Sequence, residues 1–592
     1  MMQLRVIIAI GLGSLSANVV ADAASDFEAL LDEHWEWQLQ QNPVRASRLG
    51  DRRWNDQWTD QSLDALESRH EARQVFLRRL RQIDSGKLDD AGRLNYDLFR
   101  RQLENAIDAH QFKQHLMPVN QMGGVQTLES TAEMLRFATT ADYEDWLSRM
   151  SGIETVIDQT MALMEAGRRS GYMPPQVLME RLPDQLASQL VEDATQSPFY
   201  KVFETFPDTI PDTDRGRLQQ LAREIIDDSV VPAYREFQRY FVDTYLPASR
   251  DTIGASALPN GNAWYEYQAR LYTTTNMTPD EIHRLGLNEV KRIRDEMQLI
   301  IDELEFEGSF EDFLNFLRTD PRFYYDTPEE LFDGYLAVAK RIDPELVRLF
   351  GKLPRMPYGL RPIPDTIAPD TTTAYYNRPA ADGSRPGYYY VNLYRPEVRP
   401  KYEMEVLTIH EAVPGHHLQI SLQMELEEMP NFRKYSGFTA FTEGWGLYSE
   451  RLGYEMGFYQ DPYSHFGALT YDMWRAVRLV VDTGMHYKGW TRQQAIDFFM
   501  ANAAKTEQDI VNEIDRYIAW PGQALAYKIG QLKMLELRRK AETALGDAFD
   551  VRAFHDALLG GGALPMEVLE TRMNRWLAGA LAARAANARP GE

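Results

Sequence analysis

The sequence predicts a mainly α-helical fold with one small β region. Apolar residues recur at helical spacing along most of the 592 residues, as in SLDALESRHEARQVFLRRLRQI and GRLNYDLFRRQLENAIDAHQF. Only residues 371–396 read as a β-hairpin, because two runs rich in Thr, Tyr and Val flank an Asp-Gly turn. The length suffices for a large core, so we expect one domain over 24–580 and a disordered tail at 581–592.

The first 23 residues resemble a targeting segment. Arg5 precedes a mostly apolar run over 6–20, and small residues at 20–23 suit a cleavage site. The run is too short for a comfortable membrane span, although an uncleaved anchor is the alternative. We therefore expect a signal peptide at 1–23, a mature chain from Ala24 without stable membrane insertion, and a periplasmic or secreted location.

The absence of cysteine and the negative net charge exclude several classes of function. The chain has no cysteine, which rules out disulfides, thiolate metal sites and a cysteine nucleophile, and we expect no lipid anchor on a cysteine after the apolar run. The formal net charge of −24 argues against nucleic acid and anionic membranes as partners. The sequence does not indicate the oligomeric state.

The region 25–250 is predicted to be predominantly helical. Its four histidines are interpreted as surface or core residues rather than ligands; they are His34, His70, His110 and His115. A further helix starts at Thr278-Pro279-Asp280-Glu281, with a threonine cap, proline in the first turn and acids beside it. The chain after about residue 460 is again expected to be helical.

Residues 404–428 carry the strongest functional pattern. This stretch has apolar residues at roughly helical spacing and contains His410, Glu411, His416 and His417. Many zinc hydrolases bind their metal with two histidines of one helix and use the glutamate beside the first as general base. Three histidines within eight residues, among eleven in the chain, make an ordinary surface helix a poor explanation.

The spacing differs from the usual H-E-x-x-H pattern. Pro414 stands where the second histidine would lie, and proline clashes with the carbonyl four residues back, which is that of His410. The helix should therefore open near His410, and Gly415 tolerates the irregular backbone. A turn widened by two residues would bring His416 into the ligand position. His417 is the alternative, although in a regular helix it lies roughly 10 Å along the axis.

A third ligand is expected from the segment 438–453, FTAFTEGWGLYSERLG. It offers Glu443 and Glu450, and we favour Glu443 because a lone carboxylate among Phe441, Trp445 and Leu447 would avoid an apolar setting unless it were paired or metal-bound. His410, His416 and Glu443 would then hold Zn²⁺ with a fourth position open for water.

These residues resemble a known family. HEAVPGHHLQ, TEGWGLYSERLG and RYIAWPGQALAYKIG are similar to motifs of the bacterial domain-of-unknown-function family 885, over nearly the whole mature chain. The resemblance implies a relationship to gluzincin metallopeptidases and a large helical fold with a deep channel, as in angiotensin-converting enzyme and the thermostable carboxypeptidases. The catalytic core would span about 371–535, with the small β region near the active site.

The remaining roles follow from what a zinc hydrolase needs. Glu411 would act as general base. His486 and Tyr527 are candidate oxyanion donors, which the resemblance favours because related peptidases use histidine and tyrosine there. Arg516, Lys528 and Arg478 are candidates for holding a peptide carboxylate. For Arg516 and Lys528, a structural salt bridge is an equally good explanation. An edge strand of the hairpin could pair with an extended peptide, and we assign Tyr389 there as substrate-binding. A plain structural hairpin is the alternative.

We therefore expect an exported zinc metallopeptidase that hydrolyses peptides. Two alternatives stay open: a zinc amidase acting on a non-peptide or cell-wall amide, and a non-catalytic binding protein on a peptidase scaffold. An intact Glu411 favours an enzyme, because binding alone does not require a base beside the first ligand. Neither the substrate nor the choice between exo- and endopeptidase action follows from the sequence.

Overall fold

The structure is a computed structural model that describes residues 22–364, 368, 371–380, 383 and 385–587. The predicted signal peptide at 1–23 lies outside the described residues except for Asp22 and Ala23. Among the described helices, none is both long and apolar enough to cross a membrane.

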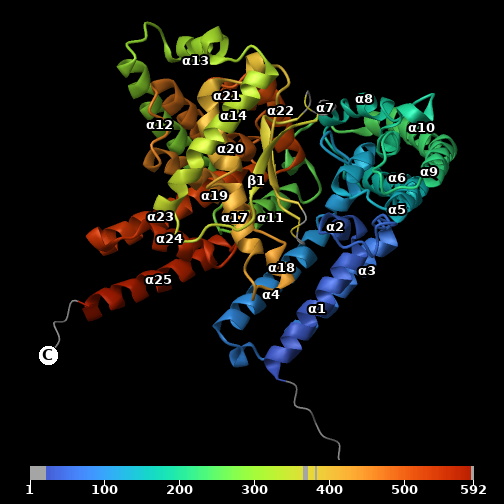
Figure 1. Cartoon of the computed structure of the whole chain (residues 1–592), viewed down its shortest axis with the longest axis horizontal. Coiled ribbons are helices and arrows are strands. Elements are labelled where there is room, and N and C mark those ends of the chain that lie inside the picture. The colour runs from blue at the N-terminus through green and yellow to red at the C-terminus, as the bar shows by residue number, and fades with distance from the viewer. Residues whose placement is uncertain (1–21, 365–367, 369–370, 381–382, 384, 588–592) are drawn as a thin grey trace, which may run out of the picture.

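The N-terminal part consists of two groups of helices. Figure 1 shows the long helices α1, α3 and α4 at one end of the molecule and a lobe of α5 to α10 beside them. The bounds are α1 (Ala23–Gln41), α2 (Pro43–Arg48), α3 (Leu63–Leu80), α4 (Asp90–His110), α5 (Thr140–Ser151), α6 (Ile153–Ser170), α7 (Gln176–Met179), α8 (Leu182–Ala187), α9 (Asp212–Ile225) and α10 (Val231–Tyr240).

The middle of the chain supplies helices that cover the later core. They are α11 (Gly261–Thr273), α12 (Pro279–Glu303), α13 (Phe310–Thr319), α14 (Pro328–Ile342) and α15 (Leu346–Leu349). The start of α12 agrees with the sequence prediction, because Thr278 caps the helix reciprocally with Glu281 and Pro279 occupies its first turn.

A three-stranded sheet follows, in the order β1-β3-β2. Strands β2 (Ala374–Asn377) and β3 (Gly387–Val391) are antiparallel, which confirms the hairpin predicted within 371–396. The sequence reading missed β1 (Tyr358–Pro362), which pairs in parallel with β3, because a five-residue strand ending in proline carries little pattern of its own.

The C-terminal part is helical and contains the site. Its helices are α16 (Met404–Glu411), α17 (His416–Met424), α18 (Asn431–Lys434), α19 (Thr439–Glu455), α20 (Pro462–His486), α21 (Arg492–Met500), α22 (Glu507–Ala519), α23 (Ala526–Leu545), α24 (Val551–Leu559) and α25 (Met566–Asn587). The tail predicted at 581–592 needs correction, because residues up to Asn587 continue α25; residues 588–592 lie outside the described residues.

Helix α20 forms the centre of this part. Every residue from Phe466 to His486 is buried, as expected for a helix surrounded by others. Helix α12 packs along α20, and α19 packs along α23. One hydrophobic cluster extends from Phe27 of α1 to Leu577 of α25. The mainly α-helical prediction is thus confirmed.

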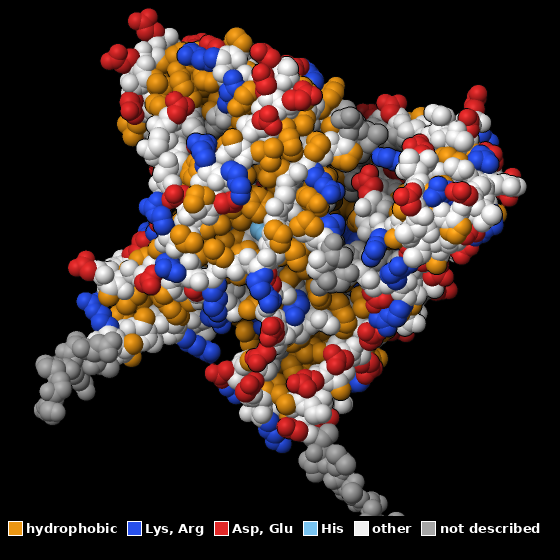
Figure 2. Space-filling view, viewed as in Figure 1, with side chains coloured by type: hydrophobic (Ala, Val, Ile, Leu, Met, Phe, Trp, Pro, Cys, Tyr) orange, Lys and Arg blue, Asp and Glu red, His pale blue; other side chains and the backbone are white. Residues whose placement is uncertain are grey.

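The surface shows how charge and hydrophobic groups are distributed. Figure 2 shows hydrophobic side chains gathered over the central region of one face, with acidic and basic side chains along the outer helices. A cavity of about 430 Å³ is lined by residues of α14 and the segment before α16, among them Arg341, Lys401 and Tyr402, and its lining does not include His410, His416 or Glu443. The predicted deep channel stays a prediction.

Candidate metal centre

The helix predicted over 404–428 breaks where Pro414 interrupts it. Helix α16 ends at Glu411 and α17 begins at His416, and the Val413–Pro414 peptide bond is cis. Gly415 fits tightly into this break: its N–H donates to the carbonyl of Ile409 at 3.0 Å, and a Cβ at this position would lie 1.9 Å from the carbonyl oxygen of His410. Any larger residue would push the two helix ends apart.

The break brings the three predicted ligands together. Glu443 Oε2 lies 3.8 Å from His410 Nε2 and 3.4 Å from His416 Nε2. Two atoms bound at 2.0–2.1 Å to one tetrahedral zinc ion would be about 3.4 Å apart. The two imidazole planes meet at 84°, so their nitrogens approach the carboxylate from different directions. The donor set and its spacing therefore fit a zinc ion.

Helix α19 supports His410 from two sides. Glu450 Oε1 accepts a hydrogen bond from His410 Nδ1 at 2.7 Å, which directs Nε2 at the ligand position. Gly446 faces the same ring, because a Cβ there would lie 2.7 Å from His410 Cε1. Glu443, Gly446 and Glu450 share one face of α19 at helical spacing. Such a carboxylate behind a histidine is typical of metal-binding imidazoles.

The electrostatics of the cluster favour a cation. Burial lowers the pKa of His410, but its contacts with Glu443 and Glu450 outweigh burial and raise the pKa to about 9. Burial raises the pKa of Glu443, but His416 and His410 reverse this and hold it well below its usual range. The side chain of Glu443 is 19% exposed and that of His416 is 11% exposed, so the cluster is reachable from solvent.

The choice between His416 and His417 is decided by geometry. His417 Nε2 donates to the carbonyl of Met356 at 2.9 Å, and the hydroxyl of Tyr376 donates to His417 Nδ1 at 2.8 Å. Burial lowers the pKa of His417 to about 4, so its ring is neutral. Both of its nitrogens tie α17 to the sheet region, and His416 is the histidine that faces Glu443.

Glu411 is the last residue of α16 and lies outside the ligand group. Its charge acts on the neighbouring His410 and on Tyr389 of β3. Tyr389 is fully buried, and its hydroxyl has no hydrogen-bond partner among the described residues. Burial and, to a smaller extent, Glu411 raise its pKa well above the usual value. Tyr389 thus lies beside the predicted base. The expectation that it lies on an edge strand needs correction, because β3 is the middle strand and pairs with β1 and β2. A substrate-binding role for Tyr389 stays a prediction.

Tyr527 of α23 lies on the Glu443 side of the cluster. Burial and the nearby Glu443 carboxylate raise the pKa of Tyr527, so its hydroxyl stays protonated and able to donate. The guanidinium of Arg478 stacks over its ring at 4.3 Å, and Gln523 Nε2 lies 3.5 Å from its hydroxyl oxygen. Arg516 donates to Gln523 at 2.9 Å and pairs with Glu513, which places it behind Tyr527.

One N–H donor group of Arg478, Nη1, has no hydrogen-bond partner among the described residues. Its Nε donates to the hydroxyl of Tyr517 at 2.8 Å and its Nη2 contacts Glu513 at 3.2 Å, but its buried Nη1 has no partner among the described residues. A buried charged donor without a partner costs free energy, and ligand-binding sites are where such costs are tolerated.

Two sequence predictions need correction. The first is His486 as an oxyanion donor: its Nδ1 accepts from the N–H of Ala255 and its Nε2 donates to the carbonyl of Tyr517, both at 3.0 Å. Burial lowers the pKa of His486 to about 4, so the ring is neutral and has no free donor. His486 joins three segments of the core instead.

The second correction concerns Lys528 as a substrate-binding cation. Its ammonium is 1% exposed and contacts Asp472 at 2.6 Å, Gln531 at 2.8 Å and Glu289 at 3.2 Å. These three contacts use its three N–H donors. Lys528 therefore joins α23 to α20 and α12, the structural alternative that the sequence left open.

Some supporting residues were not recognised from the sequence. Glu450 was seen as a competing ligand, but its contact with the far side of His410 was not foreseen; Gly446 and Arg475, which lies 3.5 Å from Glu450, were missed. The spacing of Glu443, Gly446 and Glu450 along one helix was an available signal.

Two solved structures share the fold of this chain. The chain is similar to a "putative lipoprotein" from Colwellia psychrerythraea, with a TM-score of 0.89 and 28% identity, covering 95% of this chain and 100% of that one. It also shares the fold of a "putative lipoprotein of unknown function" from Shewanella oneidensis, with a TM-score of 0.72 and 18% identity over 93% of this chain and 100% of that one.

Curated proteins offer no further guide, since none matches the chain significantly. The family described as "Bacterial protein of unknown function (DUF885)" matches residues 43–573. This match includes the three helices of the metal centre, α16, α17 and α19, and the network around Tyr527. The chain therefore belongs to the DUF885 family.

Proposed function

We propose that the protein is a zinc-dependent hydrolase that cleaves peptides. The observation that carries this proposal is the convergence of His410, His416 and Glu443 at zinc-like spacing, with Glu411 adjacent but outside the ligand group. Two histidines and one glutamate form the donor set of open, catalytic zinc sites, whereas structural zinc sites use four protein ligands. The gluzincin resemblance stated from the sequence points the same way.

The roles of the chain's own residues follow from their positions. A bound zinc ion would supply Lewis acidity, which polarises a carbonyl and acidifies water. Glu411 would take a proton from the attacking water and pass it to the leaving amine. Tyr527, protonated and close to Glu443, would donate a hydrogen bond to the carbonyl oxygen as negative charge develops on it.

The unpaired donor of Arg478 supports a more specific substrate. A carboxylate near Tyr527 could accept from Arg478 Nη1, which has no other partner among the described residues. Charge-assisted hydrogen bonds of this kind are strong and directional. We therefore propose substrates with a free C-terminal carboxylate close to the cleaved bond.

An exported location also belongs to this proposal. The predicted signal peptide supports it, and the Colwellia and Shewanella proteins are described as lipoproteins, a class found in the cell envelope. A fractionation experiment with the full chain would check it.

The central experiment is a peptide-library digest read by mass spectrometry. Zinc-loaded protein should cleave peptides and chelated protein should not, with cuts near the C-terminus. Glu411→Gln should keep zinc but turn over about a hundred- to ten-thousand-fold more slowly. Glu427→Gln, which changes an exposed glutamate after α17, is the matched control and should behave like the wild type.

Three outcomes would redirect the proposal. Wild-type rates in Glu411→Gln with normal zinc content would refute the assigned base. Equal cleavage of free and C-terminally amidated peptides would refute the carboxylate subsite. Zinc binding without cleavage of any peptide would favour the amidase or the binding protein, and a cell-wall fragment digest would separate those two.

A further inference from the structure

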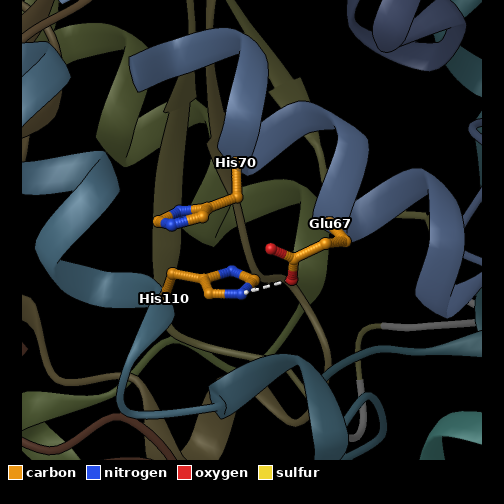
Figure 3. A group of neighbouring side chains, drawn as sticks. All are labelled: Glu67, His70 and His110. Carbon is orange, nitrogen blue, oxygen red and sulfur yellow. Dashed lines mark hydrogen bonds and ion pairs between the residues drawn. The ribbon is translucent and has the colours of Figure 1, made fainter.

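A second group of metal-binding side chains lies far from the centre in the sequence, on the N-terminal helices. Glu67 and His70 are one turn apart on α3, and His110 is the last residue of α4. Figure 3 shows the carboxylate of Glu67 and the rings of His70 and His110 gathered in the space between the two helices. The sequence pattern alone favours a surface or core role for these histidines, because they stand on different helices.

The donor atoms of the group are close enough for one ion. His110 Nε2 lies 3.1 Å from Glu67 Oε2, near the ~3.4 Å expected between two ligands of a tetrahedral zinc ion. One ligand atom from each of the three residues lies within 4.8 Å of the others. Small rotations of exposed and half-buried side chains would close the remaining gap.

Hydrogen bonds within the described residues use only part of the group's nitrogen atoms. The rings of His70 and His110 stack with centroids 4.0 Å apart, an arrangement that two imidazolium ions would not adopt. The buried Nδ1 of His70 has no hydrogen-bond partner among the described residues, and its Nε2 contacts only the side-chain amide of Gln74, at 2.8 Å.

A third ring extends the group. His115, in the short helix η2 (Gln114–Leu116), stacks on His110 with centroids 5.5 Å apart. Imidazoles with one carboxylate suit zinc and copper rather than magnesium or calcium, which prefer oxygen ligands.

We propose that Glu67, His70 and His110 bind a second divalent transition cation, such as Zn²⁺ or Cu²⁺. This site is separate from the centre at His410 and independent of the peptidase proposal. Its ligands come from two packed helices, so the ion would join α3 to the end of α4. Because Glu67 is exposed, the site should exchange its metal more readily than the buried centre.

The test is metal stoichiometry on the full chain. Metal-free wild type is titrated with Zn²⁺ by calorimetry and is expected to bind two ions of different affinity. Glu67→Gln should weaken the second ion at least tenfold, and His70→Ala should abolish it. Glu71→Gln, which changes another exposed glutamate of α3, is the matched control and should leave both ions in place.

A spectroscopic measurement makes the test independent of the first centre. In a His416→Ala background, Cu²⁺ bound to the chain should show the electron paramagnetic resonance of an ion with two nitrogen ligands, and His110→Ala should change that signal. Circular dichroism checks folding, and Glu67→Gln decides the case if a histidine variant is misfolded. Unchanged zinc stoichiometry and affinity in Glu67→Gln would overturn the proposal.

Discussion

Gly446→Ala tests the assignment of His410 as a zinc ligand, because the added methyl group would press on its imidazole ring. In the middle of α19, alanine is favoured over glycine by up to about 1 kcal/mol. At this position, however, the new Cβ would lie 2.7 Å from His410 Cε1 and 3.0 Å from both ring nitrogens.

The size of the effect follows from these distances. Non-bonded carbon atoms prefer about 3.5–4.0 Å, so the His410 ring must move by roughly 0.8 Å or more. Metal–ligand distances tolerate only about 0.2 Å. The hydrogen bond to Glu450 on the ring's Nδ1 also resists a shift. We therefore expect zinc affinity to fall at least tenfold, about 1.4 kcal/mol, while the chain still folds.

The assay is competition for zinc with a chromophoric chelator, together with thermal unfolding of the metal-free chain. Gly579→Ala, in α25, is the matched control, since a Cβ there meets nothing within 4 Å. The control should keep wild-type zinc affinity. A Gly446→Ala variant with wild-type zinc affinity would refute the assignment of His410 as a ligand held by α19.

Three further predictions concern other parts of the molecule. Glu450→Gln should lower zinc affinity about ten- to a hundredfold by weakening the support of His410, and a chelator assay that shows no change would contradict this role. Burial raises the pKa of Asp482 to about 7 from the usual 3.8. Between these two pH values the folded state binds more protons than the unfolded state, so the free energy of unfolding should fall as the pH rises from 3.8 to about 7. The expected decrease is a few kcal/mol, at ~1.4 kcal/mol per pH unit. Denaturant unfolding of Asp482→Asn should show a flatter pH dependence, and an unchanged profile would exclude this residue as the cause. Lys528→Met should destabilise the fold by about 3 kcal/mol, because Asp472 loses a buried partner, and zinc affinity should not change. A variant that is as stable as the wild type but impaired with substrate would restore the substrate-binding role of Lys528 rejected above.

Local patterns predicted much of the architecture correctly. The helical class, the start of α12 at Thr278 and the hairpin of β2 and β3 each depend on residues close together in the chain. Capping, turn chemistry and hydrophobic periodicity act over a few residues, so they can be read without knowing what packs against them. The parallel strand β1 was missed because five residues ending in proline carry little pattern of their own.

The donors on one interrupted helix can be identified from the sequence alone. His410, Glu411 and His416 are close in the chain, and Pro414 with Gly415 dictates where the helix opens. That is enough to propose a metal-binding helix, because the effect of proline on the backbone is local.

The rest of the centre depends on tertiary packing. Packing of α19 on α16 brings Glu443 to the two imidazoles and Glu450 to the back of His410, while the sheet region engages both nitrogens of His417. Packing also assigned His486 and Lys528 to the core, since each is surrounded by partners from distant segments. Partners of this kind depend on which helix faces meet in space, and no local pattern specifies that.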